Sequence, residues 1–116
     1  MSKVIVLDKS KAFADRIIKM HKYLTTEMRE FEMSKQILKS GTSIGANVSE
    51  AQQAQSKVDF ISKLSIALKE AKETEYWIER LYKGKYLTEK QYNSINTDCI
   101  ELIKLLTSII KSTKSK

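Results

Sequence analysis

Residues 88–110 read TEKQYNSINTDCIELIKLLTSII, and this segment carries both a helix start and a long apolar stripe. Thr88 and Gln91 have the spacing of a capping box, in which each side chain bonds to the backbone of the other residue. From there, apolar residues recur in alternating steps of three and four, at Tyr92, Ile95, Cys99, Leu102, Leu106 and Ile109. That spacing is typical of a helix that buries one face. The segment therefore predicts an α-helix over 88–111.

The same spacing predicts two further helices with clear boundaries. Residues 57–83 have Ser56 as an N-cap and Gly84 as the residue just after the helix, at the C′ position. Their stripe consists of Phe60, Leu64, Ala67, Ala71, Thr74, Ile78 and Leu81. Residues 9–25 follow a short N-terminal tail, and their stripe consists of Phe13, Ile17, Met20 and Leu24. Residues 26–31 fit either a loop or an extension of a flanking helix.

The remaining helix, predicted over 32–54, contains an unusual run. Residues 40–49 read SGTSIGANVS and carry no charge. Two glycines inside a helix cost about 1 kcal/mol each relative to alanine, so a loop is a competing interpretation. We favour a helix because the apolar spacing continues through Ile44 and Val48. Small residues let another helix approach closely, so this run is expected near a helix or subunit contact.

Composition narrows the class of protein. The chain has 116 residues, no proline and three glycines, which fits one domain (1–116) and nearly excludes an all-β fold. One cysteine, Cys99, and one histidine, His21, argue against a disulfide framework, a metal site or triad chemistry. No stretch is apolar enough for a membrane span or a signal peptide. We expect a cytoplasmic, all-α, antiparallel up-down-up-down four-helix bundle with no cofactor and no enzymatic activity.

The net charge of +7 allows modest attraction to polyanions. The candidate nucleic-acid-binding residues lie on the outer side of the first helix and in a basic C-terminal tail: Lys11, Arg16, Lys19, Lys22, Lys111, Lys114 and Lys116. A second cluster combines aromatic with basic residues: Tyr76, Trp77, Tyr82, Tyr86, Arg80, Lys83 and Lys85. Such a cluster can stack on bases and bind phosphate, or it can fill the end of the bundle.

Residues 39–51, KSGTSIGANVSEA, resemble the signature of a bacterial family of small four-helix-bundle proteins encoded in intervening sequences of 23S ribosomal RNA genes. The matching positions are Lys39, Ser43, Ile44, Asn47, Val48 and Glu50, and the likeness extends over about residues 10–83. The resemblance implies a ring-shaped homo-oligomer, usually a pentamer. It also implies kinship with accessory proteins of diversity-generating retroelements, in which a basic surface contacts nucleic acid and a reverse transcriptase.

The candidate residues for oligomer or helix contact all lie on the second helix: Gly41, Ser43, Ile44, Gly45, Asn47, Val48 and Glu50. Asn47 and Glu50 share one face, where they form either a binding site or an internal polar network. We expect a homo-oligomeric scaffold or adaptor that binds RNA or DNA weakly and without sequence preference. A purely structural or protein-partner module without a nucleic-acid role is the alternative.

The stripe in residues 88–110 generates a first prediction. Leu102→Ala or Leu106→Ala should lower the free energy of unfolding by about 2–5 kcal/mol, the usual effect of truncating a buried leucine. Denaturant unfolding measures this change. An unchanged midpoint would show that the stripe is not buried.

Overall fold

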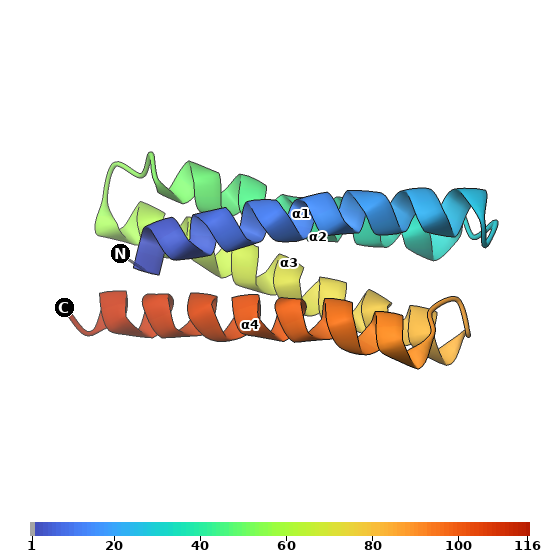
Figure 1. The fold of residues 1–116 in the computed structure, drawn as a ribbon. Coiled ribbons are helices and arrows are strands. Elements are labelled where there is room, and N and C mark those ends of the chain that lie inside the picture. Colours follow the sequence, from blue (N-terminus) through green and yellow to red (C-terminus); the bar gives the residue numbers. More distant parts are fainter. Residues whose placement is uncertain (1) are drawn as a thin grey trace.

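Four helices run alternately up and down along one long axis (Figure 1). The structure, a computed structural model, describes the backbone of residues 2–116 and the side chains of residues 5–116. The helices are α1 (Ser2–Thr26), α2 (Glu32–Ala51), α3 (Lys57–Lys83) and α4 (Glu89–Lys114). Each helix packs against its two neighbours, in the order α1, α2, α3, α4 and back to α1. The predicted all-α four-helix bundle is therefore confirmed.

The predicted start of the first helix is wrong, because the expected N-terminal tail is already helical from Ser2. Val6 is 1% exposed and extends the apolar stripe by one more step of seven ahead of Phe13. Ser10, near the predicted start, lies inside the helix, and its hydroxyl donates to the carbonyl of Leu7 (2.9 Å). Burial of Val6 against the rest of the bundle explains why the helix begins earlier than local capping signals indicate.

A buried glutamate starts α2, a cap that the sequence analysis missed. Residues 27–31 form the loop that the sequence left open. Within it, Glu30 is only 7% exposed. Its carboxylate accepts the backbone N–H groups of Glu32 (3.1 Å), Met33 (3.0 Å) and Ser34 (2.7 Å). A negative charge beside the free N–H groups at a helix start is favourable. Glu30 therefore caps α2 in the way that Ser, Thr or Asp usually caps a helix.

The connection from α2 to α3 is longer than predicted, because α2 ends at Ala51 rather than at residue 54. Ala51 is the last buried side chain of its stripe, and a longer helix would bury little more. The amide of Ala54 instead donates to the Ala51 carbonyl (3.1 Å) in a turn. The predicted start of α3 is confirmed: the Ser56 hydroxyl accepts the backbone N–H of Asp59 (3.1 Å).

The end of α3 agrees with the prediction, but the role given to Gly84 is wrong. Gly84 keeps an ordinary φ of −78°, and the left-handed residue is Lys85, with φ 68°. The amide of Lys85 donates to the Tyr82 carbonyl (3.0 Å), and that of Tyr86 donates to the Leu81 carbonyl (2.9 Å). This is a Schellman motif with lysine at the position that usually holds glycine.

The start of α4 is confirmed and its end is corrected. Thr88 and Gln91 form the predicted capping box, with N···O distances of 2.8 and 3.1 Å. The helix continues to Lys114, so the predicted basic tail after residue 111 is mostly helical. Lys111 and Lys114 lie in the last turn, where positive charge interacts favourably with the helix dipole.

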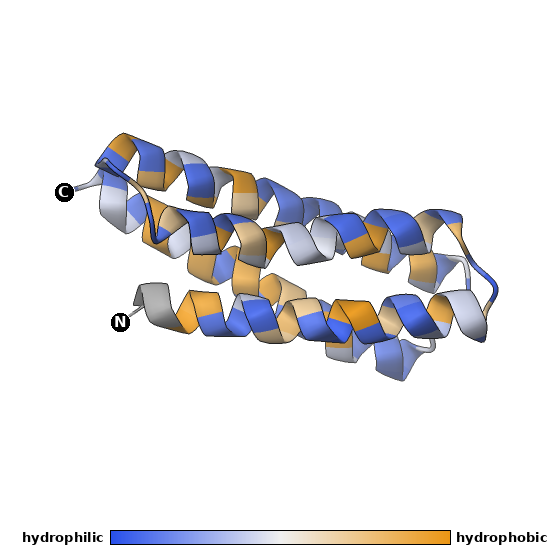
Figure 2. Cartoon of the chain, turned by 90° about the horizontal axis from the view of Figure 1, so that it is seen from above, coloured by the Kyte–Doolittle hydropathy of each residue, from blue (hydrophilic) through white to orange (hydrophobic). Residues whose placement is uncertain are grey.

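Apolar residues recur along each of the four helices (Figure 2), and their side chains meet in one core. Its largest fully buried side chains are Val6, Phe13, Ile17, Leu24, Ile37, Ile44, Leu64, Ile78, Leu81, Ile95, Leu102 and Leu106. One polar pair lies among them: Thr74 of α3 donates to the Ser40 hydroxyl of α2 (2.9 Å). Each hydroxyl has a partner there, which makes its burial tolerable.

The chargeless run of α2 is helical, as favoured above, and its glycines face α1. A Cβ atom added at Gly41 would lie 2.8 Å from Cγ1 of Ile17, which is too close. At Gly45 the nearest atoms would be those of Ser10 at 3.4 Å, an ordinary contact. Gly41 therefore sets the close approach of α1 to α2, whereas Gly45 only borders it.

This difference between the two glycines can be tested with matched variants. Gly41→Ala should destabilise the fold by about 1–3 kcal/mol, because the new methyl group overpacks Ile17. Gly45→Ala should leave stability unchanged or raise it by up to about 1 kcal/mol, since alanine is the better helix former. Urea unfolding of both variants measures the effect, and equal changes would contradict the packing argument.

Candidate nucleic-acid interface

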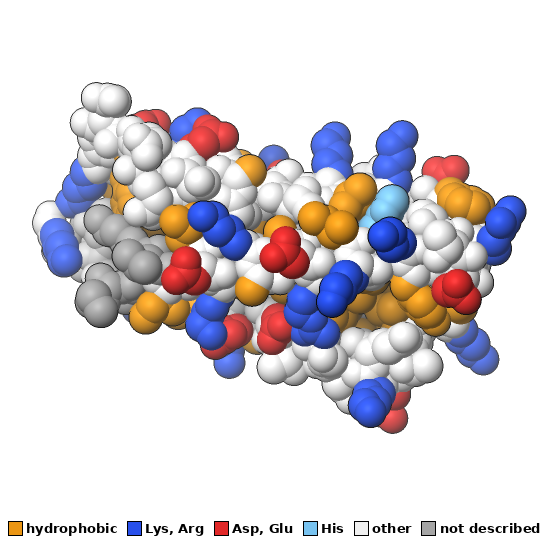
Figure 3. All heavy atoms as spheres, turned by 45° about the horizontal axis from the view of Figure 1, so that its top comes forward, with side chains coloured by type: hydrophobic (Ala, Val, Ile, Leu, Met, Phe, Trp, Pro, Cys, Tyr) orange, Lys and Arg blue, Asp and Glu red, His pale blue; other side chains and the backbone are white. Residues whose placement is uncertain are grey.

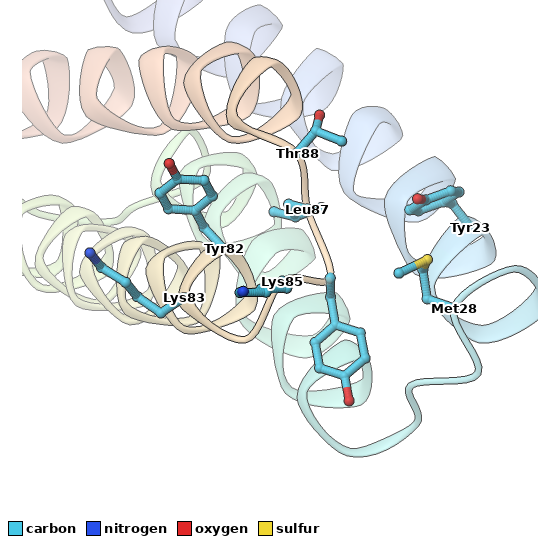
Figure 4. A pocket seen from close by; sticks show the side chains of 8 residues that line it. Tyr23, Met28, Tyr82, Lys83, Lys85, Leu87 and Thr88 are labelled. Atoms are coloured by element: carbon cyan, nitrogen blue, oxygen red, sulfur yellow. The ribbon is translucent and has the colours of Figure 1, made fainter.

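A groove opens between α1 and α4 where α1 ends and α4 begins. Its larger part, about 540 Å³, lies between these two helices. A second part, about 440 Å³, lies between the end of α1 and the α3–α4 connection (Figure 4). Tyr23 and Leu87 line both parts, so we treat them as one surface, the α1–α4 groove. In Figure 3 basic side chains border an apolar hollow at this end.

The groove exists because α1 and α4 form the most loosely packed of the four helix pairs. Polar contacts, rather than apolar ones, join them on their outer side. Lys9 pairs with Glu101 (3.2 Å). Arg16 donates to Asp98 (2.6 Å) and, from its other terminal nitrogen, to the Ser94 hydroxyl (2.8 Å). Beyond Arg16, towards the end of α1, no described ion pair joins the two helices.

The charge of the groove is of one sign. Five cationic side chains line it, and no acidic side chain does: Arg16, Lys19, Lys83, Lys85 and Lys90. The chain as a whole carries 14 acidic residues, so their absence from this lining creates a local excess of positive charge. Arg16 is neutralised by Asp98, whereas the four lysines have no ion-pair partner among the described residues. The groove is therefore suited to an anion.

Three tyrosines, Tyr23, Tyr82 and Tyr86, line the part of the groove nearest the bundle end. Tyr82 stacks on Tyr92, with ring centroids 4.3 Å apart, so one face of Tyr82 is already covered. No ring partner is described for Tyr23 or Tyr86. In Figure 4 Tyr23 lies on α1, across the hollow from Leu87.

The aromatic and basic cluster predicted from the sequence is divided by the structure. Tyr82, Tyr86, Lys83 and Lys85 line the groove. The others form a separate surface group on α3. Tyr76 and Trp77 pack edge to face at 4.9 Å, and Arg80 pairs with Glu79 (2.9 Å). This second group lies outside the groove lining, and Tyr76 in it is exposed.

The predicted nucleic-acid-binding residues do not form one surface. Lys19 lies in the groove, and Arg16 lies there but is paired. Lys11 and Lys22 are exposed on α1 outside the lining. The remaining candidates, Lys111, Lys114 and Lys116, lie at the opposite end of α4 or just beyond it. Antiparallel packing separates the two ends along a molecule 46 Å long.

Sequence reasoning missed two lining residues, Lys90 and Tyr23. Each has a signal that could have indicated it. Lys90 lies in the first turn of α4, where a positive charge interacts unfavourably with the helix dipole. A lysine at such a position indicates a role other than helix stability. Tyr23 follows Lys19 by four residues, so the two side chains are neighbours on one helix face.

The candidate contact residues of α2 mostly face inward. Gly41, Ile44, Gly45 and Val48 are buried. The hydroxyl of Ser43, a half-buried residue, donates to the Lys39 carbonyl (2.6 Å).

Asn47 and Glu50 each have a partner within the chain, but not each other. Asn47 donates to the Ser43 carbonyl of its own helix (2.9 Å). Glu50 pairs with Lys63 of α3 (3.0 Å), and this hydrogen bond together with the charge of Glu50 raises the pKa of Lys63. Glu50 is exposed, so its ion pair lies at the surface, and whether Asn47 and Glu50 bind a partner stays a prediction.

Cys99 is buried on the core side of α4. Its thiol donates to the Ala71 carbonyl (3.3 Å). Burial, with a smaller contribution from Glu75, raises the pKa of the Cys99 thiol to about 12. A thiol held protonated in this way is a poor nucleophile.

Among the described side chains, no group of three or more His, Cys, Asp or Glu residues is placed to hold a metal ion. None of the helices described is long and apolar enough to cross a membrane.

The fold places the chain among small all-α four-helix bundles. Residues 2–108 match the family model of the 23S rRNA-intervening sequence protein. The chain belongs to this family. It is also similar to a crystal structure at 1.70 Å resolution of a protein of unknown function, from the S23 ribosomal protein family of Bacteroides thetaiotaomicron VPI-5482. The two share 61% identity and a TM-score of 0.94, over 96% of this chain and 99% of the other. No curated protein matches the chain.

The environment of Cys99 leads to a prediction about reactivity. At pH 8 the folded protein should react with a disulfide reagent such as DTNB far more slowly than the urea-unfolded protein, because only the unfolded thiol ionises near its ordinary pKa. Absorbance of the released thiolate measures both rates. Similar rates with and without urea would show that the thiol is accessible.

Proposed function

We propose that this chain is a non-enzymatic, homo-oligomeric scaffold or adaptor that binds nucleic acid weakly and without sequence preference. The observation that carries the proposal is the α1–α4 groove, which has four unpaired lysines and no acidic side chain in its lining. The description of the family refers to 23S rRNA, which makes RNA the first nucleic acid to test. The buried, protonated Cys99 supports the non-enzymatic part.

Weak, sequence-independent binding follows from the type of side chain available. Lysine is a point charge that attracts phosphate, and reading a base edge calls for paired donors and acceptors in fixed geometry. Affinity should therefore come from release of counterions. A ring of identical subunits multiplies a modest site by avidity, which makes self-association part of the same proposal.

The outer side of α2 supports self-association. The side chains of the chargeless run that are not buried are all small or uncharged: Thr42, Ser43, Ala46, Asn47 and Ser49. A second helix can pack closely on such a surface without burying an unpaired charge. The family resemblance favours a pentamer, and a reverse transcriptase is the protein partner that it suggests.

A purely structural or protein-partner module is the second candidate. The observation that favours it is the use of cations in ion pairs between helices. Lys9, Arg16 and Lys63 each pair with a carboxylate of another helix. On this alternative the basic character of the chain serves packing and solubility, and nucleic acid is not bound.

Binding to RNA as a function of salt tests the proposal. The logarithm of the binding constant should fall linearly with the logarithm of salt concentration, with a slope of about −0.7 per phosphate neutralised on single strands and about −0.9 on duplex DNA. Lys19→Glu/Lys90→Glu should abolish binding, because both lysines line the groove, and leave thermal melting unchanged, because both are exposed. Absence of binding at low salt would favour the structural module.

Light scattering tests self-association. We expect a mass several times that of the 13.3 kDa chain at micromolar concentration. Ala46→Glu should dissociate the oligomer into folded monomers, because Ala46 is exposed in the single chain and a charge is harmful there only under a second subunit. A monomeric wild-type protein would refute this part, as would an Ala46→Glu variant that stays assembled.

A further inference from the structure

From the make-up of the α1–α4 groove we infer that it is a site for single-stranded nucleic acid, bound in preference to a duplex. This inference rests on the proposed function, since it names the kind of nucleic acid and the place where it binds. It is carried by three features of the groove: an apolar floor, tyrosine rings without ring partners, and lysines that face each other without an acidic partner.

The floor of the groove is apolar, formed by Met20, Leu87 and Ile95. A duplex presents phosphates and sugars on its outside and keeps the base faces stacked inside. It would therefore leave the apolar floor exposed to water. An unpaired strand can turn its bases inward and its phosphates outward. Only the single strand buries apolar surface in such a groove while its phosphates meet the basic rim.

Tyr23 and Tyr86 supply rings for stacking. Both line the groove and are partly exposed, and neither ring is paired with another aromatic ring in the described structure. Tyr82 is less available because Tyr92 covers one of its faces. Stacking on tyrosine tolerates any base, because every base has a π face, in agreement with binding that ignores sequence.

The charges along the α1–α4 pair change character at Arg16. On the N-terminal side, two cations of α1 have an acidic partner on α4: Glu101 for Lys9 and Asp98 for Arg16. One turn later, Lys19 and Lys90 line the same hollow from opposite helices. Two like charges across a groove repel each other in the free protein. A phosphate between them removes this repulsion, so an anion is favoured where the ion pairs stop.

An acidic peptide would be attracted by the same lysines, but its side chains would make few contacts with the apolar floor and the tyrosine rings. A glutamate or aspartate side chain has no flat apolar face to stack on Tyr23 or Tyr86. The observations therefore favour a nucleic-acid strand, and an acidic peptide serves as a competing probe in the test.

Fluorescence anisotropy at low salt gives the first comparison. The probes are a labelled oligothymidine of about 12 nucleotides, within the range of known single-strand sites, a DNA duplex of the same length in base pairs, and a polyglutamate peptide of similar length. The duplex carries about twice the phosphates, so charge alone makes it the tighter ligand. We expect the oligothymidine to bind more tightly than the duplex and the peptide.

Variants then locate the site. Tyr23→Leu/Tyr86→Leu should weaken oligothymidine binding by about fivefold or more per ring lost and leave duplex binding unchanged, whereas Tyr23→Phe/Tyr86→Phe should retain it. Lys19→Gln/Lys90→Gln should weaken binding more than Lys11→Gln/Lys111→Gln. Each lysine pair removes one charge from α1 and one from α4, and only the first pair lines the groove. Thermal melting verifies that every variant is folded.

The outcomes separate this inference from the proposed function. The inference is overturned, and general electrostatic binding stands, if the duplex binds as tightly as the oligothymidine. The same holds if the leucine variants of Tyr23 and Tyr86 bind as well as the phenylalanine variants, or if the two lysine pairs weaken binding equally. If the peptide binds most tightly, the groove is an interface for an acidic protein. If none of the probes binds at low salt, the inference and the nucleic-acid part of the proposed function fail together.

Discussion

The contact between Gly41 and Ile17 is the constraint on which the arrangement of the bundle depends. Without a Cβ atom at Gly41, the backbone of α2 lies directly against the Ile17 side chain. This close approach holds α1 on α2, and ion pairs of Lys9 and Arg16 join α1 to α4 on their outer side. Dense apolar packing on one side and polar bridges on the other leave room for a groove beside α4.

The groove therefore results from how α1 is held, and its chemistry comes from the ends of three helices. Lys19 belongs to α1 and Lys90 to the first turn of α4, and Lys85 is the left-handed residue just after α3. A bundle of antiparallel helices brings such ends together without any change in the core. This separation of core from surface explains how a small helical fold can acquire a binding surface while its stability rests elsewhere.

The chargeless run of α2 has two sides with different roles. Its inward side, with Gly41, Ile44 and Val48, packs within the chain. Its outward side, with Ala46 and Ser49, remains exposed and is the surface on which we propose subunits meet. A run of small residues in a sequence thus indicates close packing but not its partner. Only the fold shows which of these residues pack inside the chain and which stay exposed for a second subunit.

The sequence by itself determined the elements whose signals are local. The stripe and capping box around Thr88 located the start of α4, and Ser56 with the stripe from Phe60 to Leu81 located α3, because caps and helical periodicity act within a few residues. Other features depend on residues far apart in the chain, and only the tertiary structure decided them. Burial of Val6 extended α1 to Ser2, packing around the loop buried Glu30 as the cap of α2, and antiparallel pairing set Lys19 opposite Lys90. Such long-range contacts leave no periodic pattern in the sequence, which is why the groove appears only once the helices are packed.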